Sequence, residues 1–151
     1  MTDAQTGRCR VPIREGLLTG DLLELDAVRL LGSHCDACGE TALGRRVVCP
    51  QCGGADVRQL PLGARGVLWT YTVIRHRPPG DYKGPDPFVP FGLGLVELPE
   101  GVRVLSPLAC DIDRLAIGMP FVFSPYVRAD PDGREVVAFS FAVADEEKLN
   151  G

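Results

Sequence analysis

Alternating apolar and polar side chains in the second half of the chain predict a series of β-strands. Five segments carry this pattern: residues 66–74, 88–98, 102–109, 119–127 and 135–143. The first is the strongest, because β-branched and aromatic residues fill it, and an Asp-Pro-Asp-Gly turn at 130–133 separates the last two. Five short strands with little helix between them predict a mainly β fold, a small Greek-key barrel of the OB type.

Inside the first predicted strand, strict alternation places Trp69 and Tyr71 on one face. Two exposed aromatic rings on a basic surface would suit stacking on nucleic-acid bases. This chain is not basic overall, so we favour the barrel core or a protein interface for both side chains.

The first third of the chain predicts a helix and then a strand. Pro12 suits a first helical turn and Gly20 lies just beyond a helix end, so residues 12–18 predict a short N-terminal helix. The apolar-rich residues 22–33 predict a strand that leads into the first of two cysteine pairs.

Two Cys-x-x-Cys pairs carry the clearest chemistry in the sequence. Cys35 pairs with Cys38 and Cys49 with Cys52; a glycine follows each pair, and ten residues separate the pairs. Four thiolates on two such turns match the closed tetrahedral shell of structural zinc, which leaves no position open for catalysis. We therefore expect one zinc ion in a ribbon over about residues 34–60. Two disulfides or redox-active pairs are the alternatives.

The charge balance argues against a nucleic-acid partner. The 151 residues carry 16 Lys plus Arg and 20 Asp plus Glu, a net charge of −4, whereas nucleic-acid binders present a basic stripe. No apolar run approaches the ~20 residues that span a bilayer, and the N-terminus lacks an apolar signal core. We expect a cytoplasmic protein without a membrane segment.

Candidate catalytic residues are few. Cys110 follows the apolar stretch 104–109, so a small buried hydrophobe is a better interpretation than a nucleophile. His76 stands between two arginines and belongs to no Ser/His/Asp or Cys/His motif. His34 precedes a predicted zinc ligand, but four cysteines already complete the shell. The sequence therefore predicts no catalytic residue in this chain.

A long loop at residues 75–87 is the best binding candidate outside the cysteine pairs. Its prolines restrict the backbone and its glycines turn it. The loop gathers cationic and aromatic side chains at Arg75, His76, Arg77, Tyr82 and Lys83. These groups suit the phosphates of coenzyme A or the carboxylates of a partner protein. An ordinary solvated loop is the alternative.

Beyond these patterns, an ordered set of motifs resembles one family, the acyl-CoA-associated proteins that join a rubredoxin-like zinc ribbon to an OB-fold. The resemblance runs from about residue 13 to residue 141. Besides the cysteine pairs, its carriers are Glu15-Gly16-Leu17, Gly66-Val67-Leu68-Trp69-Thr70-Tyr71-Thr72-Val73, His76-Arg77-Pro78-Pro79, Leu95-Val96-Glu97-Leu98 and Ile117-Gly118-Met119-Pro120.

What the resemblance implies is a noncatalytic accessory subunit in a hetero-oligomer. The larger partner would be a thiolase-like enzyme that makes or breaks a carbon–carbon bond of a CoA thioester, or alternatively an acyl-CoA retro-aldolase. This chain would supply the zinc site, assist assembly and help to bind the acyl-CoA. The expected organisation is an N-terminal arm with the short helix at 1–24, the zinc ribbon at 25–62 and the OB-fold at 63–151.

Two other classes of function stay open at this point. A ribbon joined to an OB-fold could be a module that binds single-stranded nucleic acid, and retention on single-stranded DNA would favour that interpretation. A small hydrolase or thioesterase acting alone would instead turn over CoA esters without a partner.

Overall fold

In this computed structural model the described part of the chain is residues 10–144, and nearly all of its regular structure is β. One sheet contains the strands β1 (Arg10–Pro12), β6 (Arg65–Ile74), β7 (Phe91–Glu97), β8 (Arg103–Ala109), β9 (Pro120–Ala129) and β10 (Glu135–Val143). The other contains β2 (Leu18–Thr19), β3 (Arg29–Cys35), β4 (Thr41–Leu43) and β5 (Val57–Pro61). Two 3-10 turns, η1 (Leu25–Ala27) and η2 (Ile112–Arg114), complete the described elements.

The five strands β6 to β10 close into a barrel. Their order is β6-β7-β8-β10-β9, and β9 pairs back onto β6, so the sheet has no free edge at that point. The pairing of β8 with β10 is parallel, whereas the other barrel pairings are antiparallel. This closed five-stranded arrangement confirms the barrel that the alternating pattern predicted, and η2 lies in the crossover between β8 and β9.

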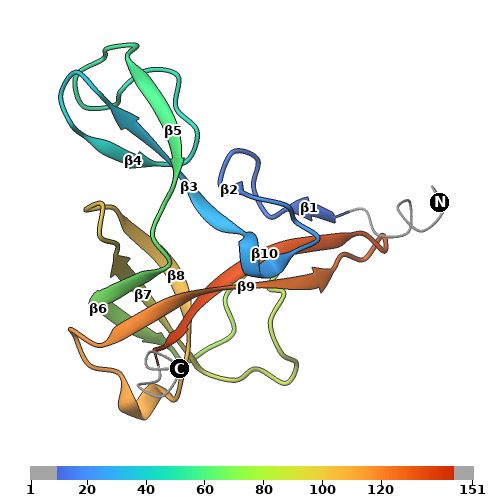
Figure 1. The fold of residues 1–151 in the computed structure, drawn as a ribbon. Helices are drawn as coiled ribbons and strands as arrows, with labels where there is room; N and C mark the ends of the chain where they lie inside the picture. Colours follow the sequence, from blue (N-terminus) through green and yellow to red (C-terminus); the bar gives the residue numbers. More distant parts are fainter. Residues whose placement is uncertain (1–9, 145–151) are drawn as a thin grey trace.

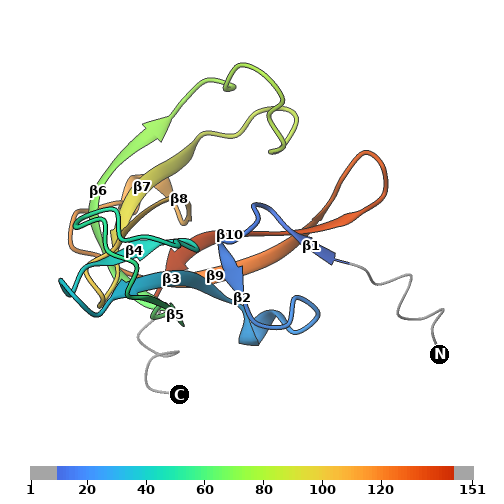
Figure 2. The same cartoon turned by 90° about the horizontal axis from the view of Figure 1, so that it is seen from above.

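The longest pairing of the barrel is the β9–β10 hairpin, and it extends beyond the closed part. The end of β10 pairs with β8 at Phe141 and Leu108, while its start, at 135–137, pairs with the short strand β1. The Arg10 guanidinium reinforces that start with an ion pair of 3.0 Å to Glu135. In both views the hairpin and the β6–β7 connection project from the same side of the barrel (Figures 1 and 2).

The predicted helix at residues 12–18 is wrong. Residues 10–12 form β1, residues 18–19 form β2, and a turn joins them. Two features explain the difference: the Ile13 N–H donates to the Val137 carbonyl of β10, and Gly16 adopts a left-handed φ of +78°. Pairing with the barrel therefore outcompetes the local helical preference.

The predicted strand at 22–33 is correct only in its second half. The first half contains η1, and β3 begins at Arg29 and continues to Cys35. Leu30 and Leu31 are buried at its start, so β3 leads from the barrel surface into the cysteine-rich region, and β5 runs antiparallel beside it (Figure 1).

Trp69 and Tyr71 do not share a face, because the strand contains a β-bulge. The β6–β7 register shifts between Leu68 and Thr70, which leaves Trp69 as the extra residue. Leu68 is buried, whereas Trp69 is 45% exposed and lies beneath the Arg103 guanidinium. The Tyr71 hydroxyl donates to the backbone carbonyl of Leu115, a buried residue of the core. A bulge reverses the alternation downstream of it, so Tyr71 turns inward.

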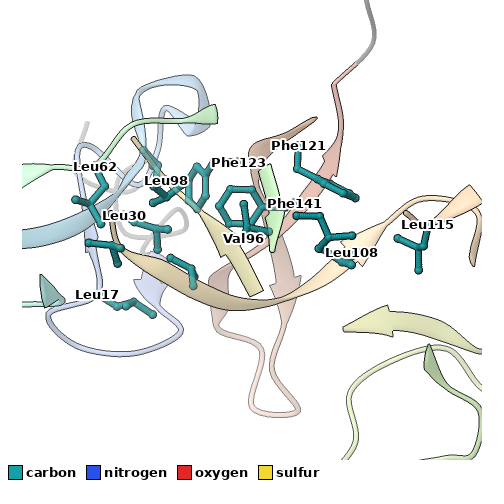
Figure 3. Close-up of a cluster of buried hydrophobic side chains, with 14 residues drawn as sticks. Leu17, Leu30, Leu62, Val96, Leu98, Leu108, Leu115, Phe121, Phe123 and Phe141 are labelled. Atoms are coloured by element: carbon teal, nitrogen blue, oxygen red, sulfur yellow. The ribbon is translucent and has the colours of Figure 1, made fainter. Parts of the chain in front are cut away.

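One continuous core links the barrel to the cysteine-rich sheet. Phe121, Phe123 and Phe141 fill the barrel, and Leu30 of β3 and Leu62 after β5 join the same cluster (Figure 3). The two strands that connect the cysteine pairs to the barrel, β3 and β5, are therefore anchored by apolar packing on it.

Gly94 of β7 creates the space in which two leucines meet inside the barrel. A Cβ at this position would lie 2.8 Å from a methyl carbon of Leu68 and 2.9 Å from one of Leu108. Such distances are below van der Waals contact, so any side chain here displaces core atoms.

In the described part of the chain no helix is long and apolar enough to cross a membrane.

We expect Gly94→Ala to destabilise the protein by about 1–3 kcal/mol, because the added methyl overpacks the core. Chemical denaturation followed by Trp69 fluorescence measures this difference. Glycine-to-alanine changes in regular, uncrowded strands tend to be stabilising, so a variant as stable as the wild type or more stable would contradict the packing account.

Candidate functional site

The four cysteines predicted as ligands come together at the end of the four-stranded sheet. Cys35 ends β3, Cys38 follows in the first turn, and Cys49 and Cys52 occupy the turn between β4 and β5. All four sulfurs lie within 4.8 Å of one another, and residues 10–144 contain no other such cluster of potential ligands. Cys35 and Cys49 are buried, while Cys38 and Cys52 are exposed.

The sulfur geometry fits a tetrahedral metal ion. The Cys35 and Cys52 sulfurs are 3.7 Å apart, and those of Cys38 and Cys49 are 3.6 Å apart. A zinc ion with four sulfurs at about 2.3 Å sets an edge of about 3.8 Å between them. A disulfide would require about 2.05 Å instead, so the geometry favours the zinc interpretation over two disulfides.

Backbone N–H groups of the second turn also prepare the sulfurs for a cation. Those of Gln51 and Cys52 donate to the Cys49 sulfur at 3.3 and 3.4 Å, and that of Gly54 donates to the Cys52 sulfur at 3.4 Å. The backbone N–H of Cys52 is the main reason that the pKa of Cys49 falls to about 7. This donor set stabilises thiolates, which are the form that binds metal.

The pKa of Cys38 indicates that backbone donors alone do not ionise all four thiols. The backbone N–H of Glu40 lowers the pKa of Cys38, but desolvation and the three neighbouring thiols outweigh it and raise the value to about 12. Four adjacent thiols cannot all ionise unless a positive ion offsets their mutual repulsion. A divalent ion on these sulfurs removes that obstacle.

His34 lies beside this centre without joining its ligand cluster. Its Nδ1 is 2.9 Å from the Thr41 hydroxyl, which links β3 to β4. Its Nε2 is 3.8 Å from a carboxylate oxygen of Asp36, beyond hydrogen-bond reach, and that oxygen accepts from the Arg58 Nε at 3.1 Å. These contacts brace the first cysteine turn and do not assemble a catalytic triad.

Cys110 lies at the edge of the barrel core and is partly buried. Desolvation, followed by the Asp111 carboxylate, raises the pKa of its thiol. A raised pKa keeps the thiol protonated at neutral pH, which favours the structural interpretation over a nucleophile.

The predicted binding residues follow β6 in the long connection to β7. Arg75, His76 and Arg77 are exposed, and the Arg77 guanidinium lies 5.3 Å from the centre of the Tyr82 ring. The Lys83 ammonium forms a 2.9 Å ion pair with Asp81. The structure therefore places these side chains on one loop, and three of the five, Arg77, Tyr82 and Lys83, make contacts inside it.

Aromatic residues that the sequence did not single out hold this loop in place. Tyr82 stacks on Phe91 of β7 with a centroid distance of 6.2 Å, and Phe88 packs against both rings. Phe88 and Phe91 were included only in the predicted second strand. Both follow closely after the Pro-rich segment, and aromatic rings at such a position can pack together and anchor a loop; this was the signal that could have found them.

Known protein families match the cysteine-rich sheet and the barrel of this chain separately. Residues 25–58 match the rubredoxin-like zinc ribbon domain of ChsH2, and residues 59–122 match the C-terminal OB-fold domain of ChsH2. A DUF35 domain-containing scaffold protein of Methanothermobacter thermautotrophicus is 33% identical over 74% of this chain and 83% of its own length. The chain belongs to the DUF35 family, with a ChsH2-type zinc ribbon and OB-fold.

Two further relatives of this DUF35 chain carry functional names. The benzoylsuccinyl-CoA thiolase subunit BbsA of Thauera aromatica is 26% identical over 80% of this chain and 83% of that protein. A solved structure named Ltp2-ChsH2(DUF35) aldolase has a TM-score of 0.58 and 30% identity, and the match covers 78% of this chain and 86% of that one. The family resemblance expected from the sequence motifs is confirmed.

We expect one zinc ion per chain, and we expect Cys38→Ser to lose it. Apparent zinc-binding free energies of about 10–16 kcal/mol in small ribbons couple directly to folding, so residues 34–60 should lose their ordered structure in this variant. Elemental analysis and amide hydrogen exchange measure the two effects. Cys110→Ser is the matched control and should keep its zinc; wild-type protein purified without chelator and free of zinc would contradict the assignment.

Proposed function

We propose that this chain is a noncatalytic accessory subunit of a thiolase-like enzyme that acts on a CoA thioester. The similarity to a thiolase subunit and to an aldolase complex carries this proposal. The chemistry of the described residues supports it, because the zinc ligands form a closed shell and Cys110 is held protonated. An acyl-CoA aldolase partner is the alternative within the same class.

The ribbon at 25–62 is the part that we propose to dock on the partner. Val47 and Val48, which precede the second cysteine pair, are 82% and 53% exposed. Two adjacent exposed valines on a rigid metal-stapled turn are suited to a protein interface. Because β3 and β5 connect this turn to the barrel, docking would also position the OB-fold at 63–151 against the partner.

The loop at 75–87 is the part that we propose to assist acyl-CoA binding. The side chains of Arg75, His76 and Arg77 are exposed at the end of β6, and the described residues form no ion pair with the two arginines. Guanidinium groups in this state can meet phosphates of coenzyme A without first breaking an internal ion pair. The aromatic cluster around Tyr82 would hold them in place on the barrel.

We expect the chain to copurify from its native host with a larger thiolase-like or aldolase subunit, in a complex that buries well above ~1,000 Å². Val47→Asp combined with Val48→Asp should weaken that complex by at least about tenfold, since it places charge in an apolar contact. Quantitative pull-down measures the loss, with zinc content as the folding control and Arg134→Ala as a distant surface control. An isolated chain that turns over CoA esters at ordinary enzymatic rates would refute the accessory role.

Replacing Arg75, Arg77 and Lys83 together by alanine should raise the KM of the complex for the CoA ester by about tenfold and change kcat little, because uniform binding contacts are lost. Steady-state kinetics of the reconstituted complex test this, with zinc content and complex formation unchanged. Equal kinetics for variant and wild type would leave the loop as a solvated connection.

A further inference from the structure

A groove of about 430 Å³ lies between the β6–β7 loop and the outer surface of the barrel. Tyr82 and Pro85 of the loop, Phe91 of β7 and the exposed residues Pro107 and Ala109 of β8 are among the residues that line it. The walls are aromatic or aliphatic for most of their extent. Such a groove suits a small ligand with an apolar body.

The third side of the groove comes from the β9–β10 hairpin. Alternate residues of a strand face opposite sides, and Phe123 belongs to the barrel core, so Tyr126 and Arg128 lie on the outer face. Ser140 shares that face, because Ser140 pairs with Ser124 across the hairpin. These three side chains add polar groups to a lining that is otherwise apolar.

Arg128 is the unusual member of this lining. Its Nε is buried, and it is the one buried side-chain nitrogen or oxygen of residues 10–144 without a hydrogen-bond partner. The described residues also place no carboxylate within ion-pair distance of its guanidinium. Removing a charged donor from water without an acceptor is unfavourable, and an anion on the outer nitrogens would offset that cost.

The charges around the groove indicate which anion fits. Lys83 lines the groove too, but its ammonium is paired with Asp81 at 2.9 Å. Lys83, and more weakly Arg128, hold the pKa of Asp81 below its usual range, so this carboxyl is ionised at neutral pH. Lys83 and Asp81 cancel, so among the side chains that line the groove Arg128 is the one charged group without an ion-pair partner in the described residues. One charge matches a carboxylate better than a dianionic phosphate.

We propose that this groove binds a monocarboxylate with an apolar body, and that Arg128 is the residue that anchors the carboxylate. Its biological role rests on the proposed function: in the complex, the groove would hold an acyl group that bears its own carboxylate, while the loop cations face the CoA phosphates. The site itself is complete in this chain and needs no partner.

Titration of the zinc-loaded, ¹⁵N-labelled full chain with 3-phenylpropionate tests the site by NMR. We expect saturable shifts at the amides of Tyr82, Tyr126 and Ser140, with a dissociation constant of about 1 mM or tighter. The neutral amide 3-phenylpropanamide should bind the same wild-type protein at least about tenfold more weakly, because it cannot form a charge-assisted pair. Phenyl phosphate in its dianionic form should also bind more weakly than the carboxylate.

Arg128→Gln should weaken binding of 3-phenylpropionate at least about tenfold and remove its advantage over the amide. Arg134→Gln, an exposed arginine paired with Asp130 and Asp132, is the matched control and should bind as the wild type does. Any of three results would overturn the proposal: no saturable binding, equal binding of acid and amide, or tighter binding of phenyl phosphate. Absence of a thiolase-like partner would sink the proposed function and leave this titration unaffected.

Discussion

Four thiol sulfurs within 4.8 Å of one another are the constraint on which the first half of this structure depends. Desolvation and the three neighbouring thiols raise the pKa of Cys38, so all four sulfurs can be thiolates together only when a cation lies between them. With zinc present, two short turns become one rigid unit at the end of β3 and β5. Leu30 and Leu62 connect those strands to the phenylalanines of the barrel. The metal thereby orders a ribbon that would have little core of its own.

The second half depends on barrel closure, and β10 is the strand that achieves it. It pairs with β9 along its length, with β8 at its end and with β1 at its start. Its outer face, together with that of β9, supports the long β6–β7 loop, and the stack of Tyr82 on Phe91 fixes the loop from the other side. The same pairings that close the barrel therefore create the groove in which Arg128 lies.

Local patterns in the sequence predicted those features that local physics decides. The cysteine spacing indicated the metal cluster, and period-two alternation indicated the five barrel strands, because both depend on residues a few positions apart. The predicted N-terminal helix failed because Ile13 bonds to Val137, a residue far away in the chain. The bulge at Trp69 and the groove that Arg128 and Tyr82 both line also arise from pairing between distant strands, which the alternation pattern does not encode.

The central claim is that this chain assists a catalytic partner and performs no chemistry alone. The most direct measurement is reconstitution: turnover of a CoA thioester is assayed with the thiolase-like partner alone, with this chain alone, and with both at equal concentration. The account predicts full activity only for the mixture, and predicts that Cys38→Ser fails to restore it while Cys110→Ser succeeds. A partner that is equally active without this chain, or a chain that is active without the partner, would contradict the account.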